Sequence, residues 1–231
     1  MAATSISKSL RVLAHLLAYP TPELRQHLPE LRRALADEGA VRGRRLEELT
    51  ALVDALDRLP ALDAEAAYVE LFDRGRATSL HLFEHVHGDS RDRGPAMIDL
   101  AKTYEQKGLY LAPGEMPDYL PTVLEFASMQ PVDVAREFLA EMTHILQAIF
   151  SALSKRQSAY ASVLGALIEL SGGRAERVDV AADPALDETW EEPLAFGGCS
   201  TNGQSRPGAA QPVQLVRNHN PSSTRSSGAS A

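Results

Sequence analysis

Apolar residues recur at three- and four-residue steps along most of the chain, which is the spacing of one face of an α-helix. The first stripe is Leu10, Leu13 and Leu17. Two further stripes predict helices over residues 23–39, with a glycine at the end, and over residues 44–59, with a proline directly after. Glycine and proline are common at these positions because both interrupt a helix. The first quarter of the chain is therefore predicted to be helical.

The same spacing returns later in the sequence. An apolar stripe over residues 97–104 is closed by Gly108, a longer stripe covers residues 134–153, and the last covers residues 163–170. No run of alternating apolar and polar residues bounded by hairpin turns is found. We therefore predict an all-α fold, a single helical bundle of about eight to ten helices with a disordered C-terminal tail.

The composition divides the chain into three parts. Residues 1–173 carry the helical stripes and are expected to form the folded domain. Residues 174–196 are acidic, and we expect this extended segment to dock on the bundle through Trp190, Leu194 and Phe196. Residues 197–231 are rich in glycine, serine and proline. This tail has too few apolar groups to offset the entropy of ordering, so it is predicted to be disordered.

The charge of the folded part is strongly negative. The 231 residues carry a formal charge of −8, but the tail has three arginines and no acidic residue, so residues 1–196 hold 20 basic and 31 acidic side chains, a formal −11. Such a body repels nucleic acid phosphates and anionic lipids and favours a basic partner. An acidic surface also keeps a protein soluble, so the charge alone does not require such a partner.

The cysteine content and the length of the apolar runs indicate in which cellular compartment the protein resides. Cys199 is the only cysteine, so no internal disulfide can form, which favours a reducing compartment. The longest uncharged apolar run is Met142 to Ser154, shorter than the roughly 20 residues that span a bilayer. We expect a cytoplasmic protein without membrane insertion.

One short motif raises the alternative of a zinc-dependent hydrolase. His81, Glu84 and His85 fit the pattern H-x-x-E-H. On a helix, two histidines four residues apart share one face and could bind zinc, with the carboxylate as general base. No third protein ligand is marked in the sequence. The other interpretation is a partly exposed helix with Leu80 and Phe83 in the core and its polar residues in solvent.

A second stretch rich in chemistry covers residues 115–126. Asp118 precedes an apolar helical segment, and aspartate is a preferred N-cap because its carboxylate accepts hydrogen bonds from the first free amides. We expect Asp118 to cap the helix that begins near Leu120. A direct role of this carboxylate in binding is the alternative.

The motifs of these stretches resemble a known family. Residues 68–72, Tyr-Val-Glu-Leu-Phe, resemble the Y-x-x-L-F signature of the TorD/DmsD/NarJ group of redox-enzyme maturation chaperones. Residues 115–125 resemble that group's E-x-D-H-x-x-x-x-L-E element, with Tyr119 where many members carry histidine. The similarity to NarJ-type assembly chaperones of nitrate reductase covers roughly residues 8–196 and is carried by residues 72–100, 116–126 and 190–196.

The resemblance implies a function that is not enzymatic. NarJ-type proteins bind the N-terminal segment of the apo catalytic (alpha) subunit of respiratory nitrate reductase. They hold that subunit while the molybdenum cofactor and iron–sulfur cluster are inserted, before membrane docking. The resemblance therefore implies no permanently bound cofactor and no metal. It names the alpha subunit as partner and proteins that deliver the molybdenum cofactor as further candidates.

An apolar groove with acidic neighbours would suit a basic amphipathic peptide. We expect this groove to be lined by aromatic and leucine side chains, with carboxylates that complement the positive charge of the peptide. Histidines near it would weaken binding in acid, because they gain charge beside a cationic ligand. The alternative for Tyr68, Leu71 and Phe72 is a place in the helix core. The residues expected to contact the partner are Tyr68, Glu70, Leu71, Phe72, Asp73, Glu84, His85, His87, Asp118 and Tyr119.

Four arginines stand in the same central stretch and allow two interpretations. They could pair with neighbouring carboxylates and fix the loop, or they could contact the anionic phosphates of the cofactor. We favour internal pairing. The arginines are Arg74, Arg76, Arg91 and Arg93, and the carboxylates Asp73, Glu84, Asp89 and Asp92.

Overall fold

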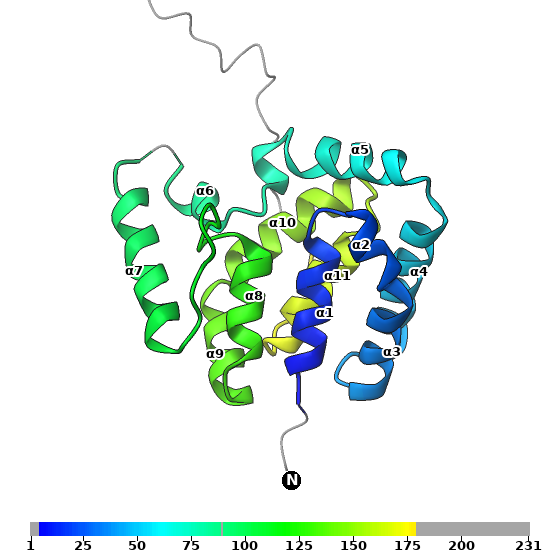
Figure 1. Cartoon of the computed structure of the whole chain (residues 1–231), viewed down its shortest axis with the longest axis horizontal. Coiled ribbons are helices and arrows are strands. Elements are labelled where there is room, and N and C mark those ends of the chain that lie inside the picture. The colour runs from blue at the N-terminus through cyan, green and yellow to red at the C-terminus, as the bar shows by residue number, and fades with distance from the viewer. Residues whose placement is uncertain (1–4, 89, 179–231) are drawn as a thin grey trace, which may run out of the picture. The chain divides into compact units, whose positions relative to one another are not determined.

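A computed structural model describes residues 5–88 and 90–178, which belong to one compact unit, Met1–Asp183 (Figure 1). These residues form eleven α-helices and one 3-10 helix and contain no strand, which confirms the all-α prediction. The helices are α1 (Ser7–Leu17), α2 (Pro22–Gln26), α3 (Leu28–Glu38), α4 (Gly43–Arg58), α5 (Ala61–Phe72), η1 (Arg76–Thr78), α6 (Leu82–Val86), α7 (Arg93–Gln106), α8 (Leu120–Ser128), α9 (Val132–Glu141), α10 (Thr143–Lys155) and α11 (Ala161–Leu170).

Two of the predicted helices are each divided in two. The helix expected over residues 23–39 breaks at His27, because Pro29 has no N–H to continue the ladder and starts a new helix instead. The one expected over residues 134–153 breaks at Met142, where the Thr143 hydroxyl donates to the carbonyl of Leu139 at 3.3 Å. A side-chain bond of this kind bends a helix. The breaks account for the larger helix count.

Helices α1 and α11 form the centre of the bundle. Figure 1 shows α1 between α8 and α3, with α11 behind it. Seven of the eleven residues of α1 and eight of the ten of α11 are buried. A helix that is apolar on nearly every side must be enclosed by other elements, and the remaining helices supply this cover.

Helix α7 stands at the edge of the bundle (Figure 1). Tyr104 is its one fully buried residue. The ring of Tyr104 lies 4.5 Å from that of Phe126, and its hydroxyl donates to the carbonyl of Pro117 at 2.9 Å. Met97 is only half-buried and Ile98 is 57% exposed. The predicted apolar stripe therefore forms a helix, but most of that stripe is only partly covered.

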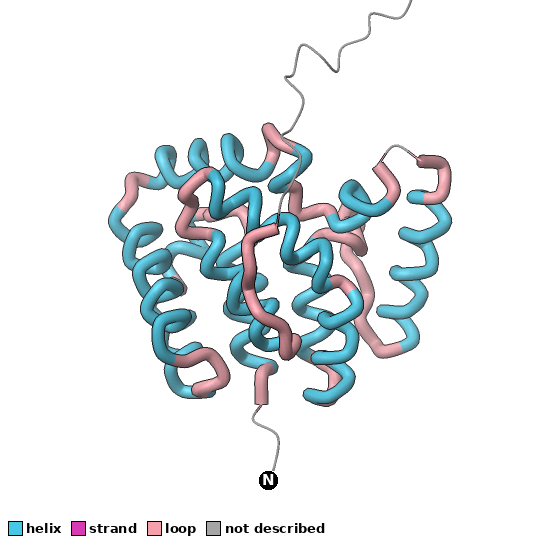
Figure 2. Tube along the Cα trace, turned by 180° about the vertical axis from the view of Figure 1, so that it is seen from behind, coloured by secondary structure: helices cyan, strands magenta, loops and turns pink. Residues whose placement is uncertain are grey.

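The chain after α11 runs over the back of the bundle as an extended loop (Figure 2). Ala175 packs against the core, and the N–H of Val178 donates to the Ser151 hydroxyl at 2.9 Å. This loop is the described beginning of the segment expected to dock. The rest of that segment, the tail at 197–231, and Trp190, Leu194, Phe196 and Cys199 lie outside the described residues.

The longest described helix, α4, has 16 residues. None of the helices in the described part of the chain combines the length and the apolar character needed to cross a bilayer.

Candidate functional site

The two stretches that carry the family motifs meet at one point of the fold. His81 and Tyr119 form an isolated antiparallel backbone bridge. Beside it, the N–H of Leu120 donates to the carbonyl of Leu80 at 2.8 Å. The bridge brings the start of α6 alongside the start of α8, so side chains from both motif stretches share one neighbourhood.

Asp118 is fully buried at this junction and caps a different helix from the one expected. Its Oδ2 accepts from the backbone N–H of Phe83, in the first turn of α6, at 3.1 Å, and its Oδ1 lies 3.3 Å from Nδ1 of His81. The N-cap of α8 is Tyr119, which makes no side-chain capping bond. The prediction that Asp118 caps α8 is therefore wrong. The bridge brings the free amide of Phe83 in the first turn of α6 within hydrogen-bond distance of this carboxylate.

His81 lies before α6 rather than within it, which contradicts the zinc interpretation. The helix begins at Leu82, so His81 and His85 do not share a helix face. His81 is bonded to Asp118, whereas Nε2 of His85 donates to the carbonyl of Ser79 at 2.9 Å. Within the described residues, no three His, Cys, Asp or Glu side chains are grouped to hold a metal ion.

His87 ends α6, and its ring packs edge-on against that of Phe83 at 5.3 Å. Like His85, it is half-buried and is held by contacts within the protein. Neither of these expected contact residues lines the cavities described below.

Tyr68 and Phe72 belong to the core, which corrects the expectation that they line an open groove. They are 4% and 5% exposed, because α5 turns this face toward the end of α1. The Tyr68 hydroxyl donates to the carbonyl of Leu17 at 2.7 Å and lies 3.0 Å from the Tyr119 hydroxyl. Burial raises the pKa of Tyr68. Leu71 is partly buried against the same core, whereas Phe72 and Tyr119 each line one of the two cavities described next.

Two cavities lie beside the bridge and share the His81 side chain. The first, which we call the acidic cavity, has a volume of about 400 Å³. It is lined by Ala18, His81, Gly114, Glu115, Met116, Tyr119, Pro121, Thr122 and Glu125. The second, the loop cavity, measures about 460 Å³. It is lined by Phe72, Asp73, Arg74, Gly75, Arg76, Ser79, His81, Glu84 and Arg93.

The acidic cavity contains residues that the sequence did not single out. Glu115 and Glu125 are exposed carboxylates at its wall, and Met116, which is 41% exposed, lines the same cavity. Glu115 and Glu125 stand at the two ends of the motif at 115–125, which was the signal available in the sequence. Their shared position depends on how the loop before α8 folds back onto that helix.

The arginines of the loop differ in how they are held. Nη2 of Arg93 lies 3.5 Å from Oε1 of Glu84 and 3.8 Å from Oδ2 of Asp118, and its side chain is 29% exposed. Arg74 pairs with Glu70 at 2.8 Å, where both side chains are exposed, instead of with Asp73. The Arg93 contacts support internal pairing.

The other arginines and carboxylates expected to pair in the loop do not decide between the two interpretations. Arg76 lines the loop cavity, and Arg91 is exposed. The Ser90 hydroxyl donates to the carboxylate of Asp92 at 3.1 Å. Asp89 lies outside the described residues.

The environment of His81 favours its charged form. The hydrogen bond to Asp118 raises the pKa of His81, and the carboxylate of Glu84 acts in the same direction. Partial burial and the nearby Arg93 oppose this change. His81 therefore gains its charge at a higher pH than a free histidine, at the wall that the two cavities share.

Comparisons with known proteins give one family. The profile of a family described as nitrate reductase delta subunit matches residues 18–164. The nitrate reductase molybdenum cofactor assembly chaperone NarJ of Escherichia coli is 42% identical over 193 residues, which are 79% of this chain and 82% of NarJ. The nitrate reductase-like protein NarX of Mycobacterium tuberculosis is 38% identical over 116 residues, half of this chain and 18% of NarX.

A solved structure is similar in fold. A candidate redox enzyme maturation protein from Archaeoglobus fulgidus aligns with a TM-score of 0.51 at 19% identity, over 73% of this chain and 95% of that one. At this identity the likeness supports the shared helical fold alone.

Proposed function

The chain belongs to the nitrate reductase delta subunit family, and on that premise we propose that its acidic cavity binds the N-terminal segment of the catalytic subunit of respiratory nitrate reductase. The chain is a NarJ-type chaperone of nitrate reductase maturation and not an enzyme. The form of the partner and the segment bound are the proposal.

The chemistry of the acidic cavity carries this proposal. Met116, Tyr119 and Pro121 supply apolar surface, while Glu115 and Glu125 supply exposed negative charge. An amphipathic helix or extended peptide with one apolar face and basic flanks complements this arrangement. Electrostatic complementarity of this kind selects among partners and speeds their encounter.

Holding the partner before its cofactors arrive defines the chaperone step. In our proposal the protein binds the apo form of the catalytic subunit in the cytoplasm and keeps its N-terminal segment from engaging the membrane. The molybdenum cofactor and the iron–sulfur cluster are then inserted by delivery proteins. The chaperone needs no permanently bound cofactor for this role, because it acts through binding alone.

His81 gives the proposed binding a dependence on pH. Its side chain lies in the wall of the acidic cavity, and protonation adds positive charge beside a cationic ligand. We therefore expect the peptide to bind more weakly in acid than near neutral pH.

Calorimetric titration tests the site directly. A synthetic peptide with the N-terminal sequence of the cognate catalytic subunit is titrated into the full-length chaperone. The double variant Glu115→Gln, Glu125→Gln keeps the shape of the cavity and removes its charge, so we expect binding roughly tenfold weaker. The matched control is Glu47→Gln, Glu105→Gln, which removes two exposed carboxylates elsewhere. Equal affinity of both double variants would contradict the site.

The identity of the partner can be tested independently of the binding site. A tagged chaperone is recovered from cells grown anaerobically with nitrate, and the bound protein is identified and assayed for molybdenum. We expect the catalytic subunit without molybdenum. Recovery of only the metal-loaded subunit would overturn the proposed order of events, whatever the calorimetry shows.

A further inference from the structure

A large cavity among the described residues lies away from the motif region. It is an open groove of about 880 Å³ between α4, the turn before α11, α11 itself and the loop at residues 175–177. We call it the arginine groove, because its lining includes Arg42, Arg44, Arg45 and Arg177. The acidic residues in its lining are Glu48 and Glu169.

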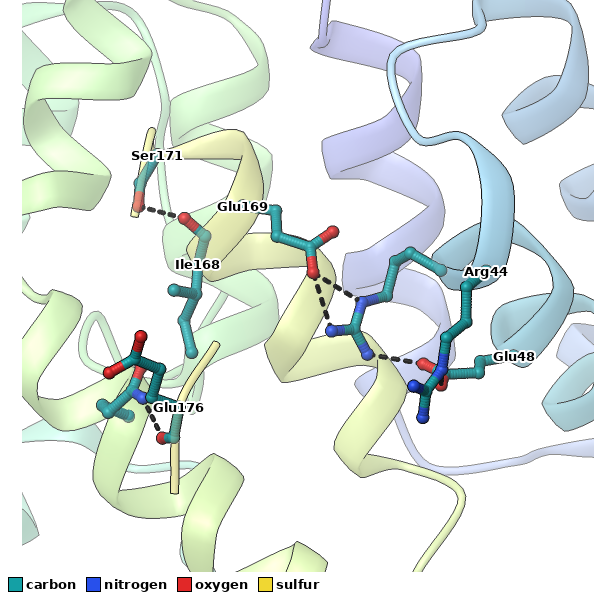
Figure 3. A network of polar contacts seen from close by, with 8 residues as sticks. Arg44, Glu48, Ile168, Glu169, Ser171 and Glu176 are labelled. Carbon is teal, nitrogen blue, oxygen red and sulfur yellow. Dashed lines mark hydrogen bonds and ion pairs between the residues drawn. The ribbon is translucent and has the colours of Figure 1, made fainter. Parts of the chain in front are cut away.

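Both glutamates are held by arginines inside the groove. Arg45, only 15% exposed, donates from Nη1 to Glu48 at 2.6 Å and from Nη2 to Glu169 at 2.7 Å. Nε of Arg44 lies 2.7 Å from the same Glu48 carboxylate (Figure 3). A side chain at Gly165 would overlap the Arg45 guanidinium, so this glycine makes room for the arginine. This network of ion pairs joins α4 to α11 and holds the side chains at the base of the groove in place.

The charge of the groove is opposite to that of the protein. Four arginines face two carboxylates, although the chain as a whole has a formal charge of −8. Arg42 and Arg177 are exposed, and the Arg44 side chain is 90% exposed. These arginines line one groove, so their positive charges reinforce one another over distances up to the Debye length, which is about 10 Å at 0.1 M salt.

We propose that the arginine groove docks an acidic segment of a partner protein, independently of the acidic cavity. Guanidinium groups bind carboxylates through paired hydrogen bonds. Nε of Arg42 donates to the carbonyl of Gly39 and Nε of Arg44 to Glu48, so in these two exposed arginines the terminal Nη groups are the donors that a ligand would meet. Phe150 and several alanines also line the groove, so an apolar surface lies beside the arginines. A volume of this size, open to solvent, fits several peptide residues rather than one small ion.

The proposal can be tested with a fluorescent peptide and the full-length chain. The probe is a short synthetic peptide rich in glutamate with one leucine, and the reference is the same peptide with lysine in place of glutamate. We expect the acidic probe to bind and the basic reference not to bind in this groove. The double variant Arg42→Glu, Arg177→Glu should weaken the acidic probe at least about tenfold.

A matched variant separates the groove from net charge. Arg11→Glu, Arg33→Glu makes the same charge change at two exposed arginines outside the groove, and its affinity should stay near that of the unaltered chain. Equal weakening by both double variants would overturn the proposal, as would displacement of the probe by inorganic phosphate at equal concentration. All four substituted arginines are exposed, and thermal melting verifies that each variant is folded.

Discussion

The carboxylate of Asp118 and the backbone N–H of Phe83 are joined by a hydrogen bond of 3.1 Å although 35 residues separate them in the chain. Through this bond the second motif stretch caps the helix of the first. The same carboxylate lies next to His81 and Arg93, so one buried side chain fixes the wall between the acidic cavity and the loop cavity.

Replacing Asp118 should therefore destabilise the whole junction. Asp118→Ala leaves the Phe83 amide and the side chains of His81 and Arg93 without their buried partner, and we expect a loss of about 3 kcal/mol in the free energy of unfolding. Chemical denaturation measures it. Asp37→Ala removes an exposed carboxylate and should change stability by less than about 0.5 kcal/mol. A similarly small effect at Asp118 would contradict its structural role.

The helices could be predicted from the sequence because their signal is local. The stripe of Leu10, Leu13 and Leu17 lies on one short segment, and Gly39 adopts the left-handed conformation (φ 62°) that its position after a helix suggested. Asp118 was assigned to the wrong helix because the choice depends on a segment far away in the chain. The same holds for Glu115 and Glu125, which share a cavity only after the loop has folded back.

The raised pKa of His81 predicts how its contribution to stability varies with pH. A histidine with a higher pKa in the folded state stabilises the protein below the pKa of the unfolded chain, and this contribution is lost as the pH rises through the folded value. His81→Gln should therefore cost more stability at about pH 5.5 than at about pH 8. Asp118, Glu84 and Arg93 are the charged groups that set this pKa.

Thermal melting of both proteins across that range measures the difference. The control is His27→Gln, because His27 is an exposed histidine with one exposed carboxylate partner. A stability difference at His81 that grew with rising pH would have the wrong sign and would refute the assignment.

Replacing the loop arginines should show that Arg93 contributes to stability and that Arg91 does not. Arg93→Ala removes the contacts to Glu84 and to buried Asp118, so it should lower stability by about 1–2 kcal/mol. Arg91→Ala changes an exposed side chain with no ion pair to any described residue, and it should have little effect. If Arg93→Ala melted normally yet blocked cofactor insertion in cells, contact with the cofactor would replace internal pairing as the explanation.

The effect of Gly165→Ala on stability should depend on Arg45 and should change sign when Arg45 is removed. In the unaltered chain, Gly165→Ala displaces the partly buried Arg45 guanidinium from Glu48 and Glu169 and should destabilise the protein by about 1–2 kcal/mol. In an Arg45→Ala background the space is free, and alanine should instead stabilise α11 by up to about 1 kcal/mol through its higher helix propensity. Chemical denaturation of the four proteins gives the coupling energy. Effects of the same sign in both backgrounds would show that Gly165 serves another purpose.

The backbone bridge between His81 and Tyr119 also has a topological consequence. The chain passes this point twice, so residues 82–118 form a loop that the bridge closes at its base and that the packing of Tyr104 on Phe126 fastens to α8. Doubling the length of such a loop adds only about 0.6 kcal/mol of closure entropy. Residues added to the exposed turns of this loop should therefore cost little stability, provided that the backbone bridge and the Tyr104 contact remain.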